Sequence, residues 1–330
     1  MRYRVLDIKW SGGIQSEMLK FPFVQWYWLM HYKSRSLPGP MRSDLTQRFE
    51  YVLYYESGKY DLAILHLTQD CLDPIAWECG RGALYREMDE VIQDIPKIVM
   101  LHGVPPRAER VGAVHSPDEI TRRIKEIAGH NRIVVGSEQA AREWGCGQPI
   151  CDGLEPNDWL DLPKQARVVT GRLPVRGCSD RDRKFVESVR HELKALDIID
   201  CHLGNSYIAT NWDDYRNLLG RALIYLDPIR DSSAARARAE AMLSGCCVLT
   251  FPTHDAAAFI ENGVNGFMIE TNAKMIARLV DELICAPKRT IGIGQQGKLT
   301  AQLRFDWDRF ARNWKDMLHS VVCETSSPVA

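Results

Sequence analysis

Short apolar runs recur along the first half of the chain, separated by polar turns and amphipathic stretches. Residues 3–10, 60–67 and 96–104 are predominantly apolar, which is typical of strands buried on both faces of a parallel sheet. Residues 131–145 repeat the order of strand, polar turn and helix. Residues 14–33 contain a dense aromatic section and predict another helix. The first half therefore predicts alternating strands and helices.

The same alternation continues in the second half. Apolar runs at 197–204, 222–228 and 246–251 predict strands, and residues 272–284 carry apolar side chains at helical spacing. A C-terminal helix is predicted to present one apolar face, made of Trp307, Phe310, Ala311, Trp314, Met317 and Leu318. This pattern predicts an α/β protein with two doubly wound domains, in which ligands bind beyond the carboxyl ends of the strands.

The length of 330 residues suits two domains of about 150 residues each. We place an N-terminal Rossmann-like domain at residues 1–165 and a second one at 166–305. Residues 306–330 form the C-terminal helix and a tail.

Charge and cysteine content exclude some classes of protein. The net charge is −1, and neither half has the basic excess of a nucleic-acid-binding module. The ten cysteines include no Cys-x-x-Cys pair, so we interpret them as reduced, buried thiols of a cytoplasmic protein. The N-terminus lacks the apolar core of a signal peptide, and no apolar run approaches the ~18 residues of a membrane-spanning helix. We expect no integral membrane segment, which leaves room for a peripheral membrane contact.

The stretch DPIRDSSAARARAEAMLSGCCVL, residues 227–249, carries the strongest chemical signal. It predicts a helix that begins after a strand, capped by Ser232 or Ser233. Backbone N–H groups at Ser232 to Ala234 would face an anion such as a diphosphate. Glu240 follows about two turns later, and a carboxylate accepts both hydroxyl hydrogen bonds of a ribose. The pattern indicates a nucleotide-diphosphate site; the alternative is an ordinary capped helix with a solvated glutamate.

The residues that follow resemble a known family. EAMLSGCCVLTF and FIENGVNGFMIE resemble the donor-binding signature of retaining GT-B glycosyltransferases of the family 4-like type, the glycosyl transferases group 1. Glu240 matches the second glutamate of the family's Glu-x7-Glu motif, which binds the nucleotide ribose. The first glutamate falls on Ser232, and the neighbouring Asp231 is the candidate to replace it at the donor sugar. The resemblance implies two Rossmann-like domains facing a cleft, with the C-terminal helix crossing back to the first domain.

Other segments match the family in order along the chain. SGGIQ, with Gly12 and Gly13, resembles the loop that approaches the donor diphosphate, and CHLGN, with Gly204, resembles a loop near the base. His102 follows a strand like the family histidine that contacts the donor sugar. Ser137, which starts a helix, is a candidate donor contact or simply a helix cap. The family's diphosphate-binding cations correspond to two arginines, Arg172 and Arg176.

The resemblance implies transfer of a sugar from a UDP-, GDP- or ADP-sugar with retention at the anomeric carbon. It implies no bound cofactor and no metal. We assign catalysis to His102, Arg172, Arg176 and Asp231, because placed cations and helix-terminal amides stabilise the departing diphosphate.

The acceptor site is predicted in the aromatic segment of residues 21–42, with Trp26, Trp28 and Lys33 as its candidates. Aromatic rings stack on sugars and bases; the alternative is a helix face packed in the core. The acceptor would be a glycan, a lipid-linked intermediate or a small molecule.

The sequence also bears on three other functions. A modified nucleic-acid base as acceptor is compatible with the aromatic and basic segment but not favoured by the charge balance. A non-catalytic sugar-nucleotide-binding pseudo-enzyme is suggested by Ser232 in place of an acid. A Rossmann dehydrogenase is disfavoured, because no Gly-x-Gly-x-x-Gly follows a strand with an acidic residue about 20 positions on.

Overall fold

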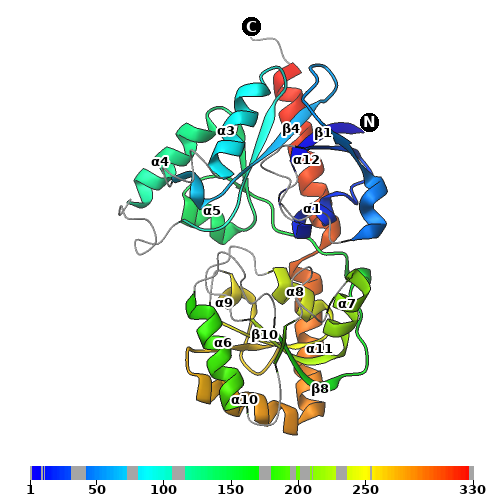
Figure 1. Ribbon diagram of the computed structural model, residues 1–330, viewed down its shortest axis with the longest axis vertical. Coiled ribbons are helices and arrows are strands. Elements are labelled where there is room, and N and C mark those ends of the chain that lie inside the picture. Colours follow the sequence, from blue (N-terminus) through cyan, green and yellow to red (C-terminus); the bar gives the residue numbers. More distant parts are fainter. Residues whose placement is uncertain are drawn as a thin grey trace. The chain divides into compact units, whose positions relative to one another are not determined.

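The computed structural model describes most of the chain, and the described residues are 2–8, 10, 12–30, 42–72, 81–105, 116–170, 180–193, 198–200, 209, 211–227, 236–252 and 255–326. They form two compact units (Figure 1). Unit 1 comprises Met1–Gly153 and Asp308–Ala330, and unit 2 comprises Leu154–Trp307. The division falls at Gly153 rather than at residue 165, so the segment leading into the second sheet belongs to unit 2.

Unit 1 is built on a parallel seven-stranded sheet with the order β3-β2-β1-β4-β5-β6-β7. Its strands are β1 (Tyr3–Ile8), β2 (Val24–Leu29), β3 (Phe49–Val52), β4 (Leu62–Leu67), β5 (Lys97–Leu101), β6 (Arg132–Val135) and β7 (Gln148–Pro149). Its α-helices are α1 (Gly12–Met18), α3 (Arg81–Val91), α4 (Pro117–Ala128), α5 (Glu138–Trp144) and α12 (Trp307–Ser326), and the short 3-10 helices are η1 (Ser43–Arg48) and η2 (Gln69–Leu72).

Helices cover both faces of this sheet (Figure 1). Alternate strand residues such as Leu6 and Leu65 share one core cluster with side chains from α3, α4 and α5. On the other face, the rings of Phe21 and Phe310 lie 5.4 Å apart, and Tyr3 Oη lies 3.1 Å from His319 Nδ1. The face opposite the α3–α5 cluster is therefore covered by α1 and α12.

The prediction of one helix over residues 14–33 is wrong, because α1 ends at Met18 and Val24–Leu29 form strand β2. β2 lies between β1 and β3, so its aromatic side chains are enclosed on both faces of the sheet. Trp28 stacks on Phe49 with ring centroids 4.2 Å apart, and it is 1% exposed. Burial in an inner strand, which suits aromatic side chains, decides the structure here rather than local helical spacing.

Unit 2 is built on a parallel five-stranded sheet with the order β12-β11-β10-β8-β9. Its strands are β8 (Gln165–Thr170), β9 (Ile198–Asp200), β10 (Ala222–Asp227), β11 (Cys247–Thr250) and β12 (Phe267–Met268). Its helices are α6 (Asp180–Glu192), α7 (Trp212–Arg221), α8 (Arg236–Leu243), α9 (Ala256–Phe259), α10 (Ala273–Cys285) and α11 (Pro287–Arg304), with the 3-10 helix η3 (Pro156–Asp158). One core cluster joins α6 and α10 to the sheet, and another joins α7 and α8 to it (Figure 1).

A tight turn ends α8 and starts β11. Gly245 has φ +73°, and its N–H donates to the carbonyl of Met242 while the N–H of Cys246 donates to that of Ala241. This pair of bonds is the Schellman motif, which favours glycine at the left-handed position. Helix α11 packs directly on the turn, because a Cβ at Gly294 would lie 2.3 Å from the Gly245 carbonyl oxygen. The Ser-Gly pair therefore fixes where α8 ends in front of the strand.

The last helix completes the core of unit 1. Phe310, Trp314 and Leu318 of α12 are each 1% exposed or less, in line with the apolar face that their spacing predicts. A Cβ at Gly153 would lie 2.4 Å from the Cβ of Phe310, so the chain passes close to this helix as it leaves the first sheet.

Candidate functional site

The order of strands in unit 1 places a switch point between β1 and β4. The chain runs from β1 outward to β2 and β3, and then continues on the other side of β1 with β4 and β5. In open α/β sheets ligands bind beyond the carboxyl ends of the strands at such a point. Since side chains alternate between faces, Asp7 and His66 lie on the opposite face from the α3–α5 core cluster. The switch point therefore brings together two polar residues on the face next to α1.

Three residues form a hydrogen-bonded array there, the Asp–His–His array of Asp7, His66 and His102. His66 Nε2 lies 2.7 Å from Asp7 Oδ1, and His66 Nδ1 lies 2.8 Å from His102 Nε2. Asp7 and His66 are 1% and 2% exposed, whereas His102 is half-buried. The array therefore leads from a buried carboxylate to a ring within reach of solvent.

Two further residues hold the array in place. The indole of Trp10 stacks on His66 and His102, with ring centroids 5.2 Å and 5.7 Å away. Gln15 of α1 donates through Nε2 to Asp7 Oδ2 at 2.7 Å, and its Oε1 accepts from the N–H of Trp10 at 2.8 Å. The loop after β1 and the start of α1 are thereby joined to the carboxylate.

The array includes one residue that the sequence singled out and two that it did not. His102 directly follows β5, as its motif predicts, and its N–H donates to the carbonyl of Leu67. Asp7 and His66 lie in strands that sequence reasoning treated only as apolar runs. A polar residue near the end of each run was the available signal, because the carboxyl ends of parallel strands meet at one edge.

The other predicted donor contacts of unit 1 occupy helix starts. Helix α1 begins at Gly12 and continues through Gly13. Ser137 caps α5, since its Oγ accepts from the N–H of Ala140 at 3.0 Å, and the residue is 3% exposed. The cap accounts for Ser137 without a ligand.

The predicted acceptor residues Trp26 and Trp28 are core side chains. They are 2% and 1% exposed, and Trp26 Nε1 donates to the carbonyl of Met18 at 3.1 Å. Side chains enclosed in this way offer almost no surface to an acceptor, and the structure supports the alternative of core packing for both.

Unit 2 has a second switch point, between β8 and β10. From β8 the chain goes to β9 on one side, and then to β10 and β11 on the other. The two strands end at Thr170 and Asp227. Thr170 Oγ1 donates to the carbonyl of Leu226 at 2.9 Å, and Thr250 Oγ1 donates to Asp227 Oδ2 at 3.0 Å. Buried polar side chains thus mark the carboxyl ends of β8, β10 and β11.

Glu240 lies in α8 beside this edge, with 7% of its surface exposed. Its Oε2 accepts from the Tyr215 hydroxyl at 2.6 Å, and its Oε1 accepts from Arg236 Nε at 2.7 Å. Arg236 precedes it by four residues, so both lie on one face of the helix. A carboxylate has about four lone-pair positions, and two direct bonds leave capacity for a diol. Glu240 is therefore held in place, not a solvated surface glutamate.

Arg238 is a buried cation on a different face of α8, and sequence reasoning missed it. It is 2% exposed, with Nη1 3.2 Å from Thr250 Oγ1 and Nη2 3.3 Å from Asp255 Oδ1. Its guanidinium lies 5.3 Å from the ring centroid of Phe259. Arg238 therefore ties α8 to the end of β11 and the start of α9.

Several predicted site residues lie outside the described residues, namely Lys33, Arg172, Arg176, Gly204, Asp231, Ser232, Ser233 and Ala234. Most of them follow a described strand in the sequence: Arg172 comes just after β8, and Asp231 to Ala234 come between β10 and α8. Their roles stay predictions.

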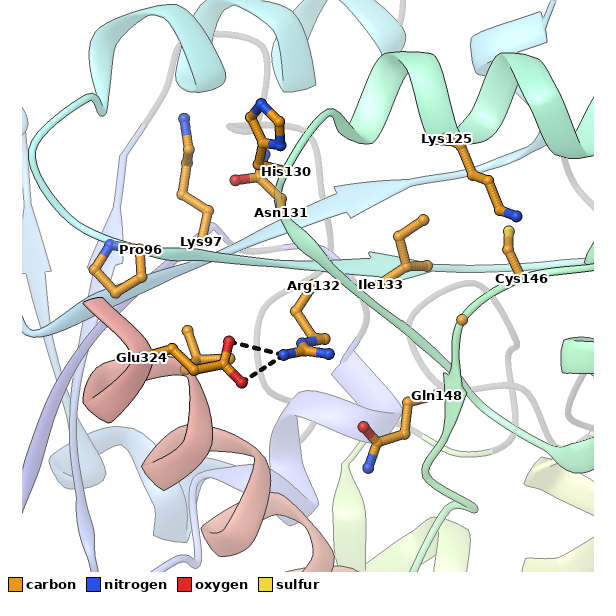
Figure 2. A pocket seen from close by; sticks show the side chains of 12 residues that line it. Pro96, Lys97, Lys125, His130, Asn131, Arg132, Ile133, Cys146, Gln148 and Glu324 are labelled. Atoms are coloured by element: carbon orange, nitrogen blue, oxygen red, sulfur yellow. Dashed lines mark hydrogen bonds and ion pairs between the residues drawn. The ribbon is translucent and has the colours of Figure 1, made fainter. Parts of the chain in front are cut away.

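A groove with a cavity volume of about 750 Å³ lies at the opposite, amino ends of β5, β6 and β7 (Figure 2). Two of its cations already have partners. Lys97 Nζ lies 2.6 Å from Asp89 Oδ1, and Arg132 reaches both carboxylate oxygens of Glu324, at 2.7 and 2.8 Å. Because ligands of such sheets bind at the carboxyl ends, we do not assign the groove to the nucleotide.

The described residues contain neither a metal-binding cluster nor a helix suited to a membrane. No group of three or more His, Cys, Asp or Glu side chains there is arranged to hold a metal ion. Among the described helices, none has both the length and the apolar character needed to cross a membrane.

Several solved structures share this fold, and glycosyltransferases are among them. HepE from Anabaena, in complex with UDP-glucose, matches with a TM-score of 0.65 and 15% identity over 97% of this chain and 100% of its own. A glycosyltransferase from Rickettsia africae matches with a TM-score of 0.64 and 14% identity, covering 97% of this chain and 99% of that one. Sucrose-phosphate synthase from Thermosynechococcus elongatus matches with a TM-score of 0.63 and 13% identity, covering 98% and 100%.

Neither a scan against protein-family models nor a search of curated proteins found a match. The structural likeness spans nearly the whole length of both partners in each comparison. The chain therefore has the GT-B fold of these glycosyltransferases, as the sequence resemblance implies.

Proposed function

We propose that the protein is a retaining glycosyltransferase that moves a sugar from a nucleotide-diphosphate sugar to an acceptor. The observation that carries the proposal is the buried carboxylate of Glu240, held by Tyr215 and Arg236 beside the switch point of unit 2. Glu240 matches the ribose-binding glutamate of the sequence motif. Its carboxylate is held in place, and it keeps the capacity to accept the two hydrogen bonds of a ribose diol.

A UDP-sugar is the donor to test first. HepE, which shares the fold, is in complex with UDP-glucose. We propose that Glu240 accepts from the ribose hydroxyls, and that Arg172, Arg176 and the N–H groups of Ser232 to Ala234 bind the diphosphate. Cations placed at the leaving group stabilise the negative charge that grows as the bond to the sugar breaks.

We propose that His102 contacts the donor sugar, as the family resemblance implies. The bond from the anomeric carbon to the diphosphate breaks, the acceptor oxygen bonds to the same face of the sugar, and the proton of the acceptor hydroxyl passes to the departing diphosphate, so that the configuration is retained. We assign no metal ion to this step, and Asp231 remains the candidate contact in place of the family's first glutamate. For the acceptor we propose a glycan, a lipid-linked intermediate or a small molecule.

The donor site is tested by the affinity of the purified protein for UDP, GDP, ADP and their glucose conjugates, measured by calorimetry. We expect one nucleotide to bind, and Glu240→Gln to raise its Kd by about tenfold or more, because a hydrogen bond to a charged group is lost. The control is Asp161→Asn, which also removes a carboxylate with hydrogen-bonded partners in unit 2, Gln295 and Lys298. Asp161 precedes β8, so this variant should bind the nucleotide as the wild type does.

Two results would contradict the proposal: no binding of any of these nucleotides, or equal binding by wild type and Glu240→Gln. Binding without turnover of any donor would favour the non-catalytic alternative. With a turned-over donor, the anomeric coupling constant of the first product in a proton spectrum reports whether the configuration is retained.

A further inference from the structure

We infer that Asp7 and His66 are positioning residues that fix the tautomer and the ring plane of His102. What His102 then contacts rests on the proposed function, whereas its protonation pattern does not.

The carboxylate of Asp7 can only accept. Besides His66, it receives the N–H of Ile8 at 2.7 Å on Oδ1 and Gln15 Nε2 at 2.7 Å on Oδ2. Gln15 also donates to the carbonyl of Ile8 and accepts from the N–H of Trp10, which fixes its amide orientation. Three donors around one carboxylate match the requirements of a buried, ionised acid.

Each bond then determines the next. Since Asp7 accepts, His66 Nε2 carries the proton of that bond, and a ring that holds only this one proton has its lone pair on Nδ1. His102 Nε2 lies 2.8 Å from this lone pair and must therefore carry a proton. The lone pair of His102 is thereby placed on Nδ1.

The ring planes are fixed as well as the protons. The Trp10 indole is tilted by 10° from the plane of His66 and by 19° from that of His102. Rotation of either imidazole would break both this stacking and a hydrogen bond within the array. The direction of the His102 Nδ1 lone pair, a hydrogen-bond acceptor, is thereby fixed together with the ring plane.

The protonation pattern can be measured without any substrate. In nitrogen-15 spectra of histidine-labelled wild-type protein near neutral pH, we expect Nε2–H and an unprotonated Nδ1 for both His66 and His102. Loss of signals in His66→Gln and His102→Gln assigns the two rings. A proton on Nδ1 of His102, or a doubly protonated His66, would overturn the inference.

Asp7→Asn tests whether Asp7 determines the tautomers of His66 and His102. Its single carbonyl oxygen cannot accept from three donors, and an amide NH₂ facing His66 would reverse the tautomers of both rings. Replacement of the equivalent aspartate by asparagine has this effect in the Ser-His-Asp triad. We expect the His102 proton to move to Nδ1, kcat for the turned-over donor to fall by about tenfold or more, and the Kd of the nucleotide alone to stay unchanged.

Glu17→Gln is the matched control, because Glu17 is another buried carboxylate of α1, 1% exposed and paired with Lys20. It should leave the tautomers of His66 and His102 unchanged and preserve kcat. Unchanged tautomers and kcat in Asp7→Asn would refute control by Asp7. The expected tautomers in a protein that turns over no sugar nucleotide would reject the proposed function and leave the positioning role intact.

Discussion

Arg236, Arg238 and Glu240 show how three charged residues in one short helix acquire different surroundings. Arg236 and Glu240 are four residues apart and pair with each other, while Arg238 turns to another face and meets Thr250 and Asp255. The alternating spacing of arginines and alanines gave no sign of which arginine would be buried. A charge enclosed in this way is stable only with its partners present.

Replacement of Arg238 tests this role. Arg238→Ala should lower the free energy of unfolding of the protein by about 3 kcal/mol, because it removes the buried one of the two arginines that pair with Asp255, leaving Arg304, takes a donor from Thr250, and opens a void beside Phe259. Urea denaturation followed by circular dichroism measures the change. The control is Arg278→Ala in α10, whose side chain is exposed, with an expected change within about 0.5 kcal/mol. Equal stability of the two variants would contradict a structural role for Arg238.

At the scale of elements, the contact between α8, its terminal turn and α11 sets the position of Glu240. The Schellman turn at Gly245 ends α8, and Gly294 and Gly297 of α11 leave room for backbone of other segments. A Cβ at Gly297 would lie 2.8 Å from the carbonyl oxygen of Asn265. The close approach of these backbone segments explains why α11 contains glycines, although glycine weakens a helix interior.

Two glycines of α11 form a matched pair for a test. Gly294→Ala should destabilise the protein by about 1–3 kcal/mol, because its Cβ would meet the backbone of Gly245. Gly292→Ala, in the same helix, has nothing within 4 Å of its new Cβ and should stabilise the protein by about 0.5–1 kcal/mol. The midpoints of thermal unfolding of both variants give the comparison. A Gly294→Ala variant as stable as Gly292→Ala would contradict the packing of α11 on the turn.

At the scale of the whole molecule, cysteines report which regions are closed to solvent. Seven free cysteines lie among the described residues: Cys71, Cys246 and Cys247 are buried, Cys146 and Cys151 are intermediate, and Cys285 and Cys323 are exposed. Burial raises the pKa of the Cys246 thiol to about 11, and its Sγ donates to the carbonyl of Leu219 at 3.2 Å. Burial likewise raises the pKa of Cys247 to about 12.

These values predict the order of alkylation in the native protein. Since the thiolate is the reactive form, Cys285 and Cys323 should be alkylated by iodoacetamide at pH 8.5, and Cys246 and Cys247 only after unfolding. Peptide mass spectrometry measures each site, with urea-unfolded protein as the control for reagent access. Rapid native labelling of Cys246 would contradict the closed core of unit 2.

The pKa shifts also give the sign of a pH effect on stability. Above the ordinary thiol pKa of 9.0, the unfolded chain loses protons that folded Cys246 and Cys247 retain. Unfolding then releases protons, so the contribution of these thiols to the free energy of unfolding falls as pH rises above about 9.

The sequence by itself determined the fold class and much of the choice of site residues. Short apolar runs separated by helical stretches allow only strands covered on both faces, which means two parallel α/β sheets. The position of Glu240 before a Ser-Gly turn, and of His102 after a strand, follows from local order along the chain. These two positions can be predicted because each depends only on the few residues next to it in the sequence.

The tertiary structure alone decided features that depend on distant partners. Val24–Leu29 became a strand because β1 and β3 enclose it, although its spacing fitted a helix. The Asp–His–His array joins residues 59 and 36 positions apart, and only the strand order places them side by side. Arg238 is buried because the end of β11 supplies its partner. Local sequence limits which secondary structures a segment can form, whereas pairing with and burial against remote segments decide which one it forms.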